Sequence, residues 1–187
     1  RQSYLCIQEW KNKDTFEQRK PHKRPKNHPS SLHPKLARAM INLAQAKTIL
    51  DPFCGSGGIL IEGCLAKKKM YGSDISAWML DKAKANLDFF KLKPSLQVKD
   101  ALQLTKKVEA IVTDIPYGRN TKSQDIKKLA KNFLKQAESI TKKVVVGLPS
   151  SVSLQYLLKN TSFKCNFEYT VHLHHSLSKR VVVFYKK

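Results

Sequence analysis

The chain has 187 residues, which is enough for one domain with its own hydrophobic core. It carries 35 Lys and Arg against 14 Asp and Glu, a formal net charge of +21. This excess is larger than solubility requires and favours a polyanionic partner, most simply a nucleic acid. The alternative is a lysine-rich composition spread over every solvated face. Because no apolar run approaches the length of a membrane span and no signal peptide is visible, the sequence predicts a cytoplasmic protein.

The first 30 residues differ in composition from the rest. We expect a short strand at 4–7, a helix start at Asp14 or Thr15, and then an extended, irregular stretch at 19–29 that is rich in proline and cations. Residues 1–30 are therefore predicted to be a basic N-terminal arm or linker, and residues 31–187 a single domain.

Helical and strand-like patterns alternate along this domain. The expected helices are 30–46, 59–66, 76–90, 123–140 and a short one that Ser150 or Ser151 caps and that ends at Leu158. The expected strands are 48–50, 69–74, 96–100, 108–113, 143–148, 163–174 and 180–185. Alternation predicts an α/β fold with a mostly parallel sheet and helices on both faces. The short link at 176–179 predicts that the last two strands form an antiparallel hairpin at one edge.

A glycine-rich turn follows the first expected strand. It reads Asp-Pro-Phe-Cys-Gly-Ser-Gly-Gly over residues 51–58 and leads into a helix, so backbone N–H groups would face a ligand there. The spacing is not that of a dinucleotide-binding or phosphate-binding loop. The run resembles the first motif of class I S-adenosylmethionine (SAM) methyltransferases, which have a Rossmann-like fold. The alternative is a glycine-rich turn of some other α/β protein.

Acidic residues end the first four expected strands: Asp51, Asp74, Asp100 and Asp114. One such acid is commonly a turn or capping residue, but four in succession indicate a ligand site, because ligands of open parallel sheets bind outside the carboxyl ends of the strands.

The resemblance implies cofactor contacts around these acids. Asp51 would face the ammonium of SAM, Asp74 would accept both ribose hydroxyls, and Asp100 the adenine amino group. The other residues implied to bind SAM are His33, Phe53, Cys54, Gly55, Gly57, Gly58, Ile75 and Ala101. At His33 related enzymes often carry a hydroxyl side chain.

Residues Asp114, Ile115, Pro116 and Tyr117 resemble the [Asp/Asn/Ser]-Pro-Pro-[Tyr/Phe] motif of enzymes that methylate exocyclic amino groups of bases. Such an amine is a poor nucleophile because its lone pair is delocalised into the ring. The Asp114 carboxylate and the Ile115 carbonyl would accept its hydrogens, and the negative charge would stabilise the positive nitrogen of the transition state. Tyr117 would stack on the target base. The alternative is a plain turn.

Together with the stretches at 19–25 and 34–44, these motifs resemble the tRNA guanine-10 N2-methyltransferases, both the archaeal enzymes and the catalytic subunit of their eukaryotic counterpart. The resemblance covers most of residues 15–150. It implies SAM as cofactor and tRNA as substrate. Family members usually carry an N-terminal THUMP region, and some need a small zinc-binding activator protein. The chain starts with Arg where the THUMP region would end, so we expect a catalytic domain whose RNA placement is supplied by a THUMP-type domain or chain.

Other functions remain open at this point. The same motif occurs with N2-guanine methylation of rRNA and with N6-adenine methylation of RNA or DNA, and the fold could also serve a non-catalytic RNA-binding subunit. No metal site is predicted, because no paired Cys or acid accompanies His172, His174 and His175.

Overall fold

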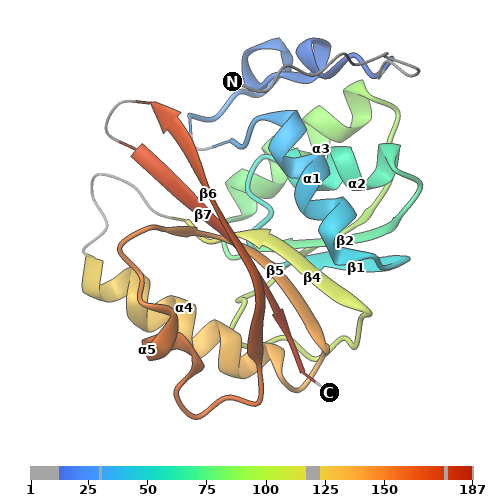
Figure 1. Ribbon diagram of the computed structural model, residues 1–187. Helices are drawn as coiled ribbons and strands as arrows, with labels where there is room; N and C mark the ends of the chain where they lie inside the picture. Colours follow the sequence, from blue (N-terminus) through green and yellow to red (C-terminus); the bar gives the residue numbers. More distant parts are fainter. Residues whose placement is uncertain (1–12, 30, 117–122, 175–176, 187) are drawn as a thin grey trace, which may run out of the picture.

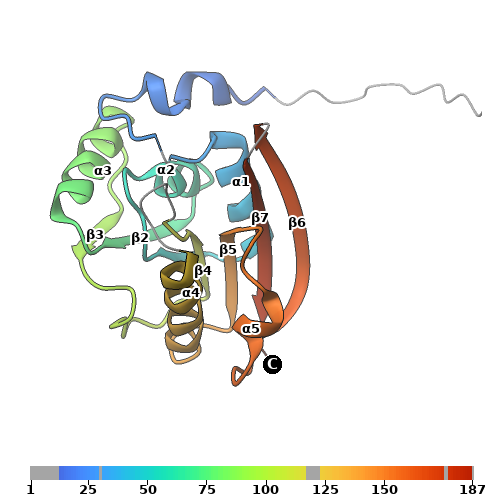
Figure 2. The same cartoon turned by 90° about the vertical axis from the view of Figure 1, so that its left-hand side faces the viewer.

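Residues 13–29, 31–116, 123–174 and 177–186 are described by the computed structural model (Figures 1 and 2). They contain one seven-stranded sheet in the order β3-β2-β1-β4-β5-β7-β6. The strands are β1 (Thr48–Asp51), β2 (Lys69–Asp74), β3 (Ser95–Val98), β4 (Ala110–Asp114), β5 (Lys143–Pro149), β6 (Lys164–His174) and β7 (Leu177–Tyr185). Strands β1 to β5 pair in parallel, and β7 runs antiparallel to both β5 and β6. The predicted mostly parallel sheet with a C-terminal antiparallel hairpin is confirmed.

Helices cover both faces of this sheet (Figures 1 and 2). One face carries α1 (Pro34–Ala44), α2 (Gly58–Leu65) and α3 (Ala77–Phe89), and the other carries α4 (Ser123–Ala137) and α5 (Leu154–Leu158). Each face has its own apolar core: Met40 and Leu60 belong to the first cluster, Phe133 and Leu148 to the second. The aliphatic strands β4 and β5 are buried between the two layers, so their ends are held rigidly at one edge of the sheet.

Several expected boundaries differ from the structure; α1, for example, begins at Pro34 and not at residue 30. Three of the differences have a clear local reason. Ser153, rather than Ser150 or Ser151, caps α5, because its hydroxyl accepts the Tyr156 N–H. Asp100 lies two residues beyond the end of β3, in a turn that its own side chain closes by accepting the Leu102 N–H. The last strand begins at Leu177, so Lys179 lies inside β7 and not in a connecting loop.

The described part of the N-terminal segment packs on the domain. It forms two 3-10 helices, Phe16–Arg19 and Pro21–Lys23, and runs across the end of α1 and α2 (Figure 1). Arg19 is buried and pairs with Glu62 of α2, where Arg19 Nε lies 2.7 Å from Glu62 Oε1. Arg19 therefore stabilises the fold and is not free to bind a nucleic-acid backbone. The expected strand at 4–7 lies outside the described residues, and a boundary near residue 30 stays a prediction.

Among the helices of the described ranges, none has the length and apolar composition that crossing a bilayer requires.

Candidate active site

The glycine-rich turn joins β1 to α2 with a backbone that only glycine adopts freely. Gly55 has φ = 51° and Gly57 has φ = 86°, both in the left-handed region. A Cβ at Gly57 would lie 3.3 Å from Ala83 Cβ of α3, so the turn and this helix are in close contact. The Cys54 N–H donates to the Ser73 carbonyl, which ties the turn to the end of β2. The sequence therefore builds a tight backbone loop beside the ends of two parallel strands.

Asp74 is fixed at the end of β2 by two backbone donors. Its Oδ2 accepts the Gly55 N–H at 2.9 Å, and its Oδ1 accepts the Ser76 N–H at 3.0 Å. Each oxygen keeps a second lone pair, and the residue is only partly buried. The neighbouring Ile75 side chain is 73% exposed, an unusual state for an isoleucine. Asp74 can accept hydrogen bonds from a diol, and the uncovered Ile75 side chain can pack on a base. Together they fit the nucleoside half of SAM.

Asp51 at the end of β1 is more deeply placed. It is 1% exposed, and its Oδ1 accepts the Thr113 hydroxyl at 2.6 Å and the Phe53 N–H at 3.3 Å. Burial raises the pKa of Asp51 to about 8, although both donors oppose this rise. The carboxyl group therefore links β1, the glycine turn and β4. Its predicted contact with the SAM ammonium stays a prediction.

Two further predicted cofactor residues lie at the N-termini of helices. His33 caps α1, and its Nδ1 accepts the Lys35 N–H at 3.2 Å. Burial lowers the pKa of His33, and the positive charge of Lys20 adds to this effect, so the neutral ring is favoured. Gly58 is the first residue of α2, and the Arg24 guanidinium covers it, since a Cβ at Gly58 would lie 3.1 Å from Arg24 Nη1.

The remaining predicted cofactor residues are mostly covered by protein. Phe53 packs edge-on against Phe133, with ring centroids 5.2 Å apart. Cys54 is buried, and burial raises the pKa of its thiol far above the ordinary value, so it is no nucleophile. Ala101 is buried after the Asp100 turn. Phe53, Cys54 and Ala101 therefore pack around the glycine turn and the Asp100 turn as structural residues.

The Asp114 motif ends β4 on the same edge of the sheet as the glycine turn. The Ile115 side chain is buried, and its N–H donates to the Gly147 carbonyl at 3.2 Å, which fixes the start of the motif. Pro116 is exposed, and Tyr117 lies outside the described residues. Burial raises the pKa of Asp114, and the ammonium of Lys179 opposes that rise.

Lys179 is the residue that sequence reasoning missed. Its Nζ lies 2.5 Å from Asp114 Oδ2, and the residue is 3% exposed. Only the start of the last strand could have indicated it. Because β7 begins three residues before the expected Arg180, Lys179 lies opposite Pro149, at the end of β5 beside the motif.

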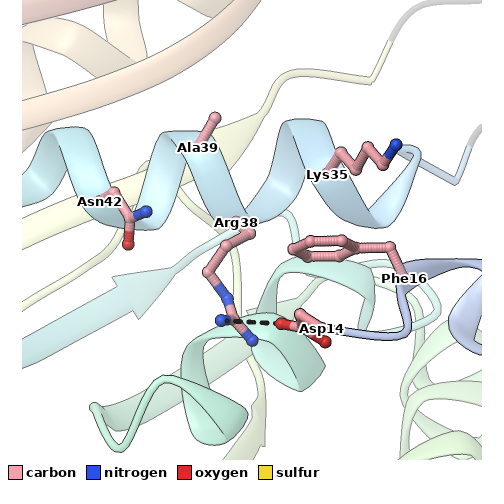
Figure 3. A pocket seen from close by; sticks show the side chains of 6 residues that line it. All are labelled: Asp14, Phe16, Lys35, Arg38, Ala39 and Asn42. Carbon is pink, nitrogen blue, oxygen red and sulfur yellow. Dashed lines mark ion pairs between the residues drawn. The ribbon is translucent and has the colours of Figure 1, made fainter. Parts of the chain in front are cut away.

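One surface pocket lies away from the strand ends. It holds about 390 Å³ between the N-terminal segment and α1, and Figure 3 shows the pair of Arg38 and Asp14 beside Phe16 in its wall. No predicted site residue lines this pocket, so it is separate from the strand ends.

The chain is similar to known methyltransferases. The family model of the RMKL-like methyltransferase domain matches residues 21–179. The chain belongs to this family. The RMKL-like domain is 38% identical over 183 residues to a tRNA (guanine(10)-N2)-dimethyltransferase of Methanothermobacter thermautotrophicus, a match that covers 92% of this chain and 54% of that protein. It is 31% identical to a probable tRNA (guanine(10)-N2)-dimethyltransferase of Methanothermococcus thermolithotrophicus, covering 81% of this chain and 98% of that one.

The RMKL-like domain also has the fold of solved methyltransferases. Its superposition on TrmN from Thermus thermophilus has a TM-score of 0.70 at 24% identity and covers 85% of this chain and 50% of that chain. The predicted class I fold and the resemblance to the tRNA guanine-10 enzymes are thus confirmed. The chain spans about half the length of the first curated relatives it matches.

Proposed function

We propose that the RMKL-like domain transfers a methyl group from SAM to the exocyclic N2 amino group of a guanosine in tRNA, at position 10. The observation that carries this proposal is the placement of Asp114 at the end of β4, on the sheet edge that also holds Asp74 and the glycine turn. The names of the archaeal relatives support guanine-10 of tRNA as the target.

One group of residues binds the methyl donor SAM, and another binds the acceptor amine. SAM supplies a methyl group already activated on a sulfonium. The glycine turn and Asp74 hold and orient the nucleoside and amino-acid parts, so that positioning provides much of the rate. The Asp114 carboxylate and the Ile115 carbonyl accept the two amine hydrogens and draw the nitrogen out of conjugation with the ring. When the methyl group passes from the sulfonium to the amine, positive charge would grow on the nitrogen. Asp114 would stabilise this charge and accept the proton that leaves.

Partners follow from charge and from the length of the relatives. A net charge of +21 supports a phosphate-binding surface on the domain. We further propose that a THUMP-type domain or chain helps to place the tRNA, that a small zinc-binding activator can act with it, and that the protein works in the cytoplasm.

Product analysis tests the function. The protein is incubated with methyl-labelled SAM and bulk tRNA, and the nucleosides are separated after digestion. We expect label in N2-methylguanosine or N2,N2-dimethylguanosine. A transcript with inosine in place of the target guanosine is the matched control, because inosine lacks the 2-amino group and should stay unlabelled. Label in N6-methyladenosine, or none in any nucleoside, would overturn the proposal.

A further inference from the structure

The Asp114 carboxylate has a buried cation beside it. Lys179 Nζ contacts Asp114 Oδ2 at 2.5 Å, and the Lys179 side chain is 4% exposed. The other oxygen, Asp114 Oδ1, is also buried and has no hydrogen-bond partner among the described residues. Taking an ammonium group out of water is costly, so a lysine this deeply buried is expected only where it is paired. The ion pair of Lys179 and Asp114 is therefore an internal feature of the site and not a surface contact.

Three strands cooperate to bring the two charges together. Asp114 of β4 lies opposite Gly147 of β5, and Lys179 of β7 lies opposite Pro149 of the same strand. The lysine side chain therefore passes diagonally over β5 at Gly147. A Cβ at this position would overlap Asp114 Oδ1 and would lie 3.4 Å from Lys179 Cδ. The absence of a side chain at Gly147 makes the space that the pair occupies.

The charges around Asp114 oppose one another. Burial favours its neutral form, and the negative charge of Asp114 in turn raises the pKa of Asp51 of β1. Lys179 of β7 favours the ionised form through its charge and its hydrogen bond. The proposed function needs the ionised form, because a protonated carboxyl group is a poorer acceptor for amine hydrogens and cannot neutralise the developing positive nitrogen.

We propose that Lys179 is a positioning residue, which keeps the buried Asp114 carboxylate ionised and oriented at the end of β4 for acceptance of the amine. This inference rests on the proposed function and deepens it. Lys179 acts through Asp114 and makes no contact with the substrate, so its loss changes the pH range of activity more than the affinity for SAM.

Carboxyl NMR tests this role without any substrate. The side-chain ¹³C signal of Asp114 is titrated in the wild-type protein and in Lys179→Met, with Lys179→Gln as a second neutral variant. We expect the apparent pKa of Asp114 to rise by about 1–3 units in both variants, the range that an adjacent opposite charge produces. Lys179→Arg should restore the wild-type titration. Lys164→Met, which removes an exposed lysine from the same hairpin, should leave it unchanged.

The pH profile of methyl transfer gives the second readout. The acidic limb of kcat/KM should move to higher pH in Lys179→Met, so that activity lost near neutral pH returns in alkaline buffer. Asp114 titrating at the same pH with and without Lys179, or an unshifted acidic limb, would overturn the proposal. A wild-type protein that transfers no methyl group contradicts the proposed function instead, and the NMR titration then still decides the role of Lys179.

Discussion

Asp114→Asn should lower kcat for methyl transfer by roughly 10²- to 10³-fold, the usual cost of removing one preorganised electrostatic group from a transition state. The amide keeps the shape of the carboxylate but carries no charge to stabilise the positive nitrogen. The affinity for SAM should stay within a few-fold of wild type, because Asp114 is assigned to the acceptor amine and not to the cofactor. Single-turnover transfer to tRNA and calorimetric titration of SAM measure the two effects separately.

Asp81→Asn is the matched control for this change, since Asp81 is an exposed aspartate on α3. It should transfer methyl at the wild-type rate. If Asp114→Asn also kept most of the wild-type rate, the assigned catalytic role would be wrong.

Glu62→Leu should have the largest effect on stability. Glu62 is fully buried on α2 and pairs with two arginines: Arg19 Nε lies 2.7 Å from its Oε1, and Arg38 Nη2 lies 3.0 Å from its Oε2. The nearby Arg24 guanidinium is buried as well, and its pKa is lowered by burial and raised again by the charge of Glu62. Removing this buried carboxylate leaves the two arginines only the partly exposed Asp14 as an acidic partner among the described residues. The poorly compensated buried charge should cost about 3–5 kcal/mol in the free energy of unfolding. Urea denaturation followed by circular dichroism measures it.

Glu17→Leu provides the comparison. Glu17 belongs to the same N-terminal segment, but its side chain is 66% exposed, and its contacts with Lys20 and His33 lie at the surface. Its loss should leave the free energy of unfolding close to the wild-type value. Equal effects of the two substitutions would show that the buried cluster contributes nothing beyond surface charge.

Much of the fold could be predicted from the sequence because local patterns decide it. The aliphatic run of β5 and the apolar stripe of α4 are visible in the sequence, and the strands and helices follow one another along the chain as predicted. The acids at the ends of β1, β2 and β4 were found the same way, since strand ends share one edge of a parallel sheet.

The contacts that sequence reasoning missed depend on distant residues. Lys179 is 65 positions away from Asp114, and only the exact start of β7 shows that it faces the site. Arg19 is 43 positions away from Glu62. The sequence predicts a basic arm or linker for its stretch, because composition cannot tell a buried guanidinium from a solvated one. Tertiary packing decides both cases, and a pattern within one segment does not contain that information.

Calorimetric titration of SAM tests most directly whether the strand ends hold the methyl donor. The wild-type protein should bind one SAM saturably. Asp74→Asn should bind it roughly 10- to 100-fold more weakly, because hydrogen bonds from the ribose hydroxyls to a charged carboxylate are lost. Asp88→Asn, an exposed aspartate of α3, should bind as the wild type does. A wild-type protein that binds no SAM, or an Asp74→Asn variant with undiminished affinity, would contradict the site described at the ends of β1, β2 and β4.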